Sequence, residues 1–440
     1  MNATSKPYLA LATCSLALTF SGTVMAAGFQ INEHGAAATA RGGAVFATIS
    51  DPSAVFYNPA GLTRTSGTHL SLGVTGVLPS AFYEGPGLPS TRPEGITGDV
   101  KQEGVSEWVP LPNFYASHAL SDKAHVGMGV YAPYGLGIAW KNPEEFVGRT
   151  VLHEQTLRTL FITPLAIALK LSDKVSVGVK VSLVPASVYL KRTVGATDNG
   201  QVLFPKSDFG SEGTAELAAE AFGVGFGLGT QLQLTDELSL GFAYRSAVTL
   251  DFAGQVDFQI PETAPASVAA QFPDGDIQGL LTLPHSFAGG LAWNFGKLSV
   301  EAGVNLTLWQ SYDELRILFT SGKPSDATVS PKNWEPALTY RLGGTYDFSS
   351  LVDGLAAHIG AVYDETPVPE ATLDPSLPDA DRLIGTTGIS YKWGPISTDI
   401  AYMAIVVQER ETEGNANFQT PAKYPGRLIN LASISLGYTF

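Results

Sequence analysis

The chain has 440 residues, a formal net charge of −15, and only 15% charged residues. Soluble domains carry about 25% charged residues, and a strongly acidic balance argues against nucleic acid as a partner. Glycine is abundant, with 47 residues, and no stretch after Phe20 is apolar and long enough for a transmembrane helix. If the protein spans a membrane, it does so with β-strands, because only helices and closed barrels satisfy their backbone there.

Residues 1–26 have the pattern of a secretory signal peptide. Lys6 gives a weakly positive start, Tyr8 to Phe20 is apolar, and Val24-Met25-Ala26 is a small-residue cleavage site. The apolar run is too short to span a bilayer, which needs roughly 20 residues. The only cysteine, Cys14, lies within this run, so we expect an exported mature protein without a disulfide.

Residues 27–66 differ in pattern from the rest of the chain. The stretch Ala27 to Leu62 is rich in Gly, Ala and Ser, and it shows neither strand alternation nor a helical stripe. Such a segment cannot build a core of its own, and its backbone polar groups need partners. We expect it to fold into the interior of a barrel formed by residues 67–440. An unrelated plug or a flexible arm is the alternative.

From Thr68 onward, apolar side chains recur at every second position. In 222–229 apolar side chains take the even positions and glycines the odd ones, and 175–183 and 298–308 alternate between apolar and polar or small residues. Strands with one face toward lipid and the other toward a lumen have this pattern. A soluble sandwich would also alternate, so the periodicity alone does not decide.

The connections favour an all-β, 14-stranded antiparallel transmembrane β-barrel. Tight turns such as Ser121-Asp122 and Gly394-Pro395 alternate with long stretches down the whole chain. Short turns at one end, long loops at the other and an even strand number are typical of bacterial outer-membrane barrels, with both chain ends in the periplasm. The candidate strands are 67–79, 107–120, 124–140, 157–171, 174–193, 221–234, 237–259, 280–295, 297–319, 334–348, 354–364, 381–393, 396–409 and 427–440.

Enzyme motifs are absent from the sequence. It has no Gly-x-Ser-x-Gly, Walker or His-Glu-x-x-His motif, and its seven histidines show no metal-ligand spacing. We therefore predict no catalytic residue, no metal site and no cofactor.

The third candidate strand contains Pro133 and Gly135. Proline has no N–H to give to the ladder, and within sheets it is confined to edges and bulges. A closed barrel has no edge, so the pair predicts a bulge or an inward kink. The alternative is a local irregularity without an opening.

Two charged residues are candidates for the lumen. The alternation in 355–363 puts Asp364 on the lumen face, where it is either paired or a solvated acid at the strand's end. Arg192 ends the fifth strand, beyond a register break that we expect at Pro185. The pattern does not decide whether the Arg192 side chain faces the lumen or belongs to a basic external rim.

Three regions resemble the FadL family of outer-membrane channels for long-chain fatty acids and other hydrophobic compounds. They are Ala27–Glu33 together with Tyr57-Asn58-Pro59-Ala60-Gly61-Leu62, the stretch 130–136, and 361–369 followed by 377–382. The resemblance implies that residues 27–66 are an N-terminal hatch that plugs the barrel. It also implies passive uptake of a long-chain fatty acid, or of a similar molecule such as an aromatic hydrocarbon, by lateral diffusion through a wall gap at Pro133 and Gly135.

The resemblance further implies ligand contacts from Phe29, Asn58, Arg192 and Asp364, with the arginine as the natural partner of a carboxylate. The partners are then a hydrophobic small molecule, the lipid bilayer and lipopolysaccharide, and we expect a monomer. Two rival functions are an outer-membrane lipid hydrolase and a porin for polar solutes. The first needs a Ser–His pair on adjacent strands, which we do not find, and the hatch argues against the second.

Overall fold

The computed structural model describes residues 28–86, 99–143, 147–194, 197–198, 201–202, 213–262, 264, 266–320 and 327–440. The predicted signal peptide, residues 1–26, lies outside the described residues. Within them, no helix is both long and apolar enough to cross a membrane.

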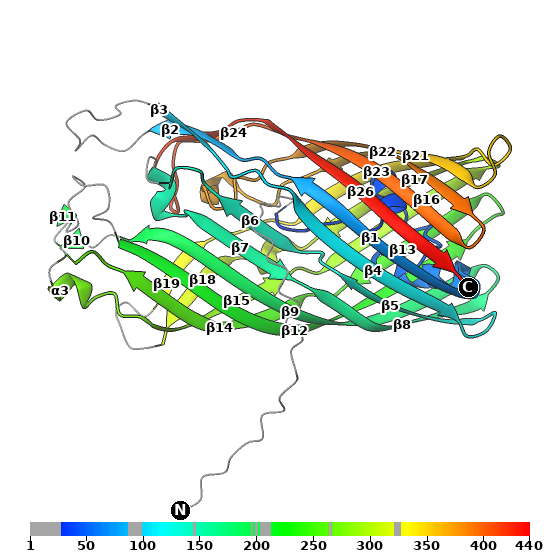
Figure 1. Cartoon of the computed structure of the whole chain (residues 1–440), viewed down its shortest axis with the longest axis horizontal. Coiled ribbons are helices and arrows are strands. Elements are labelled where there is room, and N and C mark those ends of the chain that lie inside the picture. The colour runs from blue at the N-terminus through cyan, green and yellow to red at the C-terminus, as the bar shows by residue number, and fades with distance from the viewer. Residues whose placement is uncertain are drawn as a thin grey trace, which may run out of the picture.

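The described strands confirm the 14-stranded antiparallel barrel (Figure 1). One sheet of 20 segments closes on itself, because β1 pairs with the last segment, β26. Six pairs of consecutive segments continue one another across an interruption of a few residues, so the 20 segments make fourteen strands. The segments are β1 (Thr68–Leu78), β4 (Val109–Ala119), β5 (Ala124–Tyr131) with β6 (Gly135–Ala139), β7 (Glu154–Thr159) with β8 (Phe161–Ser172), β9 (Val175–Val194), β12 (Gly213–Gln233), β13 (Leu238–Arg245) with β14 (Val248–Gln259), β15 (Gly275–Leu283) with β16 (Ser286–Phe295), β17 (Leu298–Thr307) with β18 (Glu314–Phe319), β19 (Ala327–Pro331) with β20 (Ala337–Asp347), β21 (Leu355–Asp364), β22 (Arg382–Trp393), β23 (Ile396–Val407) and β26 (Arg427–Thr439).

The two ends of the barrel differ (Figure 1). We call the end with the tight turns and the C-terminus the turn end, and the opposite end, with β2, β3 and β24, the loop end. The long connections there contain short elements that the sequence analysis did not predict. They are a four-stranded sheet of β2 (Phe82–Pro86), β3 (Asp99–Glu103), β24 (Arg410–Thr412) and β25 (Ala422–Tyr424), the pair β10 (Thr197–Asp198) and β11 (Gln201–Val202), helix α3 (Ala266–Ala269), and the 3₁₀ turns η3 (Val147–Thr150), η4 (Trp309–Ser311) and η5 (Glu370–Thr372).

Four predicted strands begin at least three residues too late. The strands predicted from 157, 221, 280 and 334 begin with β7 at Glu154, β12 at Gly213, β15 at Gly275 and β19 at Ala327. Residues 213–220 are mostly small or acidic, so no apolar alternation marks them, yet they pair with β9 along their full length.

The alternation predicts the faces of the wall correctly. The side chains of Phe222 and Ile359 are 60% and 67% exposed on the outer surface, whereas Asp364 is buried on the lumen side. The register break expected at Pro185 is wrong, because β9 runs without interruption from Val175 to Val194. The irregularity lies in its neighbour β8, whose register with β9 shifts between Ile162 and Leu165.

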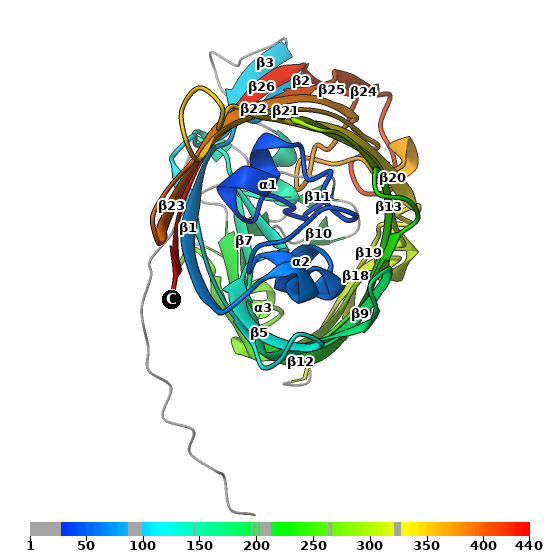
Figure 2. The ribbon, with the colours of Figure 1, turned by 90° about the vertical axis from the view of Figure 1, so that its right-hand side faces the viewer.

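Residues 28–66, which we call the N-terminal segment, lie inside the ring of strands (Figure 2). The segment holds two short helices, α1 (Ala36–Ala40) and α2 (Ala54–Tyr57), and the 3₁₀ turn η1 (Pro59–Arg64). These elements are too short to pair all of their own backbone N–H and C=O groups, so side chains of the barrel wall provide the missing hydrogen bonds. The Lys180 ammonium donates to the carbonyls of Val55 and Phe56 at 2.6 and 3.1 Å, and the buried Glu301 carboxylate accepts from the Ala47 N–H at 2.9 Å.

One lumen-facing glycine shows how closely the segment approaches the wall. A Cβ at Gly241 of β13 would overlap the backbone of Phe46 and Ala47. Gly385 of β22, by contrast, has nothing within 4 Å of the position of a Cβ.

We predict that Gly241→Ala destabilises the folded protein by about 1–3 kcal/mol, because backbone atoms must move to admit the methyl group. Gly385→Ala is the matched control, since it makes the same change in strand propensity without the clash. Thermal unfolding in detergent measures both. Equal midpoints for the two variants would contradict close packing of the segment against β13.

Candidate functional site

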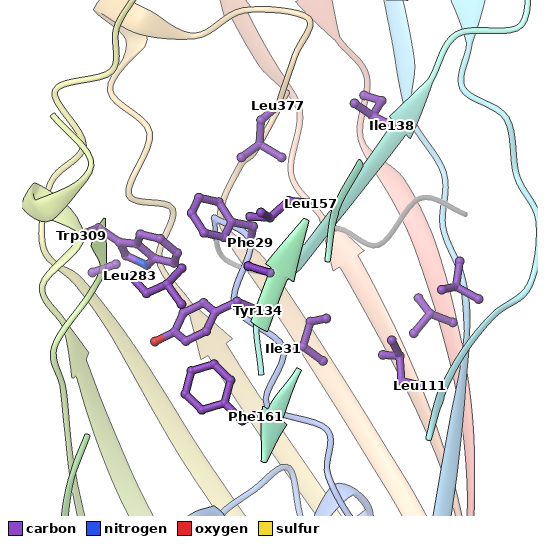
Figure 3. Packing of buried hydrophobic residues seen from close by; sticks show 14 of the residues in the cluster. Phe29, Ile31, Leu111, Tyr134, Ile138, Leu157, Phe161, Leu283, Trp309 and Leu377 are labelled. Carbon is purple, nitrogen blue, oxygen red and sulfur yellow. The ribbon is translucent and has the colours of Figure 1, made fainter. Parts of the chain in front are cut away.

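Phe29 lies in a cage of aromatic side chains, of which Figure 3 shows Trp309 and Tyr134. Its side chain is buried, and its ring centroid lies 4.7 Å from that of Trp309, 5.5 Å from Trp334, 5.7 Å from Tyr312 and 6.3 Å from Tyr134. These four residues come from interruptions between strand segments: β5/β6, β17/β18 and β19/β20. In a regular strand only every second side chain faces the lumen. The interruptions free these four aromatic residues from that alternation, so that their side chains can gather around Phe29.

The interruption between β5 and β6 is tied to the N-terminal segment. β5 ends at Tyr131 and β6 begins at Gly135. The Ile31 N–H donates to the Pro133 carbonyl at 2.8 Å, and the Gly135 N–H donates to the Phe29 carbonyl at 2.9 Å. The backbone groups that this break takes out of the barrel ladder therefore bond to the N-terminal segment instead.

The neighbouring strand β4 has a matching unpaired edge. Its ladder with β5 stops at Phe114, although its ladder with β1 continues to Val109. Donors on one edge of a strand recur at every second residue, so Pro110 and Pro112 remove two donors from the same edge. Because pairing with β1 is unbroken, we place the missing donors on the other edge, which faces the interruption. We call this region, between residues 109–113 and residues 132–136, the wall gap.

A pocket of about 470 Å³, the gap pocket, fills the wall gap. Ile31 and Leu157 line it from inside the barrel, while Leu160 and Glu220, which are exposed on the outer face, also line it. The pocket therefore reaches from the N-terminal segment to the outer surface of the wall.

Two further cavities lie inside the barrel. One of about 110 Å³ is lined mainly by apolar side chains, and we call it the apolar cavity. The other, of about 280 Å³, contains charged residues, and we call it the polar cavity. Phe29 lines both, and Leu136 lines these two and the gap pocket, so the three spaces form one series.

The polar cavity holds two cations. Lys332 is buried and pairs with Asp374 at 2.8 Å, so its charge is matched. Arg192 reaches the cavity from β9, and its Nε is buried without a hydrogen-bond partner among the described residues. The structure thus brings Arg192 and Phe29, two of the predicted ligand contacts, to one cavity.

Asp364 and Asn58 lie elsewhere. Asp364 accepts from the Thr339 hydroxyl at 2.6 Å, lies 3.8 Å from Arg382, and lines a small cavity of about 20 Å³ beside the N-terminal segment. The Asn58 amide nitrogen donates to the carbonyls of Phe46 and Thr230 at 2.7 and 3.1 Å. Asn58 in this position holds the N-terminal segment against β12, whereas Asp364 bonds to residues of the wall, and neither side chain lines the three spaces.

Sequence reasoning missed Asp379, which anchors the start of the described chain. Its carboxylate accepts from the Gly28 N–H at 2.9 Å and from the Thr366 hydroxyl at 2.7 Å, and it forms a buried ion pair with Arg382. In the sequence, the only signal for Asp379 was its position in the FadL-like stretch 377–382. The gap prolines Pro110 and Pro112 were also missed, although two prolines at strand period beside the Pro133 strand were a readable signal.

Within the described part of the chain, no group of three or more His, Cys, Asp or Glu side chains is placed to hold a metal ion. The three spaces offer a ligand an aromatic cage, apolar walls and, at Arg192, a cation whose Nε has no partner among the described residues.

The comparisons with known proteins agree with this geometry. The family model for outer membrane protein transport proteins (OMPP1/FadL/TodX) matches residues 17–439. The long-chain fatty acid transport protein of Escherichia coli (strain K12) is 24% identical over 409 residues, which cover 86% of this chain and 87% of the relative.

Solved structures show the same fold. A Pseudomonas aeruginosa FadL homologue superimposes with a TM-score of 0.80 at 22% identity, covering 94% of this chain and 100% of that chain. The toluene transporter TbuX of Ralstonia pickettii superimposes with a TM-score of 0.67 at 20% identity, covering 93% and 99%.

We predict that Asp379→Asn speeds hydrogen exchange at the backbone amides of Gly28 and Ile31 by about tenfold or more, because hydrogen bonds to a charged acceptor contribute about 1.5–3 kcal/mol. Asp381→Asn is the control, since Asp381 bonds to Tyr363 and Thr366 and not to the N-terminal segment. Exchange followed by mass spectrometry distinguishes them. Unchanged protection in Asp379→Asn would show that the aromatic cage alone holds the segment.

Proposed function

Since the chain belongs to the OMPP1/FadL/TodX family of outer-membrane transport proteins, we propose that it takes up long-chain carboxylic acids and releases them sideways through the barrel wall. The family is one of non-enzymatic channels, so the protein is a bacterial outer-membrane transporter of hydrophobic compounds and not a lipid hydrolase. The observation that carries the proposal is the series of three spaces from the polar cavity to the wall gap.

In this proposal the loop end faces outward and both chain ends face the periplasm. The ligand enters from the loop end into the polar cavity, where Arg192 meets its carboxylate. Its hydrocarbon tail then occupies the apolar cavity against Phe29. Movement of residues 29–31 away from Pro133 and Gly135 connects that cavity to the gap pocket and so to the bilayer.

Sideways release fits the energetics of a long hydrocarbon chain. Each CH₂ exposed to water costs about 0.8 kcal/mol, so release of a dozen carbons into the periplasm would cost about 10 kcal/mol. Release into the bilayer keeps the chain in an apolar medium throughout. The inner end of the barrel, which the N-terminal segment fills, then needs no opening.

The substrate class rests on Arg192. The named relatives include a long-chain fatty acid transport protein and a toluene transporter, and the apolar cavity suits the hydrocarbon part of either ligand. An arginine whose buried Nε has no hydrogen-bond partner among the described residues suits the acid, because a neutral hydrocarbon would leave that donor unsatisfied. We infer in addition that the transporter is a monomer with lipopolysaccharide around its outer rim.

We predict that restoring ladder donors on both edges of the wall gap abolishes uptake. The variant is Pro110→Thr, Pro112→Thr, Pro133→Val and Gly135→Val, in which β4 and the straightened third strand can pair. Pro164→Val in β8 is the control, since it removes a strand proline that does not line the gap pocket. Uptake of a radiolabelled long-chain acid by whole cells is measured after heat-modifiable migration has shown that each barrel is folded. Wild-type uptake by the closed variant would rule out the lateral route.

We predict that Arg192→Gln weakens binding of a long-chain acid by about 10- to 100-fold, because it removes charge-assisted hydrogen bonds worth about 1.5–3 kcal/mol. Binding of the alcohol of the same chain length stays unchanged. Lys191→Gln, on the outward face of the same strand, is the matched control. Titration of the purified protein in detergent measures both ligands, and equal loss for acid and alcohol would leave Arg192 with a structural role only.

A further inference from the structure

The wall has a second interruption, between β15/β16 and β17/β18. β15 and β18 pair over residues 277–279 and 317–319, and the ladder of β16 with β17 begins beyond residues 280–285 and 308–316. These two stretches without register pairs are six and nine residues long, so they cannot form a regular ladder. The longer stretch contains η4, which carries one of the aromatic residues of the cage around Phe29.

The apolar cavity lies against this interruption. Ile277, which is buried on the lumen side of β15, lines the cavity from inside the barrel. Leu280 of β15 and Arg316 of β18 also line it, and their side chains are 57% and 48% exposed on the outer face. The cavity therefore reaches the outer surface of the wall. We call this opening, between residues 278–281 and residues 312–317, the side window.

The side window lies at the loop-end edge of the apolar belt. Toward the turn end, Phe287 of β16 faces outward and is 45% exposed. Toward the loop end, Gln278 and Asp276 are the next outward residues of β15, and Asp251 of β14 pairs with Leu280 on the outer face. Charged side chains are costly at hydrocarbon depth and cheap near the interface. The side window therefore opens among head groups, beside hydrocarbon rather than within it.

The cation at the rim of the side window is paired. The Arg316 Nε lies 2.6 Å from a carboxylate oxygen of Glu314, so the two charges cancel. Asp251 adds a carboxylate on the neighbouring strand, about 5 Å from Leu280 and within the screening length of about 8 Å at physiological salt. The rim thus carries one net negative charge. It opposes the approach of an anionic head group and has no such effect on a neutral molecule.

We propose that the side window is an entry for uncharged hydrophobic molecules. Such a molecule meets the exposed Leu280 at the outer surface and passes directly into the apolar cavity against Phe29. An acid is instead favoured at the polar cavity, where Arg192 meets its carboxylate. The inference rests on the series of spaces proposed above as the transport route. It adds a second entry to that route and widens the substrate class to neutral compounds.

The test blocks the side window after the protein has folded. Leu280→Cys places a thiol at the opening, and the cysteine of the natural sequence, Cys14, lies in the predicted signal peptide. Whole cells are treated with benzyl methanethiosulfonate, which adds an uncharged ring that a reductant removes. Uptake of radiolabelled dodecanoate and dodecanol is measured above that of cells without the protein. We expect the dodecanoate-to-dodecanol ratio to rise about two- to fivefold, the range that an exposed charge gives, and to return after reduction.

Leu291→Cys is the matched control. Leu291 of β16 faces outward, is 42% exposed and does not line the apolar cavity, so its modification should leave the ratio unchanged. An equal rise in this control would mean that the label acts through the surrounding lipid, and it would overturn the proposal. An unchanged ratio in modified Leu280→Cys would overturn it too, whether or not total uptake falls, because neutral molecules would then have no entry of their own.

The gap-closing variant separates this test from that of the lateral route. Full uptake of both probes by the gap-closing variant rejects the lateral route. Abolished uptake in that variant, together with an unchanged ratio in modified Leu280→Cys, rejects only the side window.

Discussion

The structure depends on satisfying the backbone of a segment that lies inside a barrel without a strand partner. A buried N–H or C=O left unpaired costs about 1–3 kcal/mol, and residues 28–66 have only short helices to satisfy their own. The wall provides the partners: Lys180 and Glu301 bond to main-chain atoms of the segment, and the Arg341 guanidinium donates to the Gly42 carbonyl at 2.6 Å. The lumen face of the strands is therefore complementary to particular carbonyls and amides of the segment, and this complementarity fixes where the segment lies.

The same exchange of partners occurs at the gap, in the opposite direction. There the wall has the unsatisfied backbone, since Pro133 lies outside the ladder and Gly135 pairs with β7 but not with β4, and the segment satisfies it through Ile31 and Phe29. The wall gap and the start of the segment thus form one hydrogen-bonded unit. In the proposed lateral route, a displacement of residues 29–31 removes the inner cover of the gap and takes Phe29 out of its aromatic cage in a single movement.

The barrel could be predicted from sequence because period-two alternation is a local property, and Ile359 and Asp364 lie on the faces that it assigns. The aromatic cage could not, because alternation within one strand does not say which interruptions meet across the lumen. Trp309 and Trp334 lie in two such interruptions, and only the closed structure brings them to Phe29. The side of the wall that Arg192 faces could not be predicted for a different reason. Pro185 predicted a register break before Arg192, but the irregularity lies in β8 and not in β9.

In the proposed lateral route, the aromatic cage also explains why an apolar ligand suits the opening of the wall gap. Moving residues 29–31 breaks two backbone hydrogen bonds to β5/β6, at about 0.5–1.5 kcal/mol each, and uncovers Phe29, at about 1.5–3 kcal/mol, so this movement costs about 3–6 kcal/mol. A hydrocarbon tail that enters the vacated space regains about 0.8 kcal/mol for each CH₂ that it buries, and fewer than ten carbons offset the whole cost. Water and polar solutes gain nothing from the aromatic walls. In this proposal, the apolar contact that holds residues 29–31 in place is the same contact that a hydrophobic ligand can replace, and the ligand's own burial favours the opening of the gap.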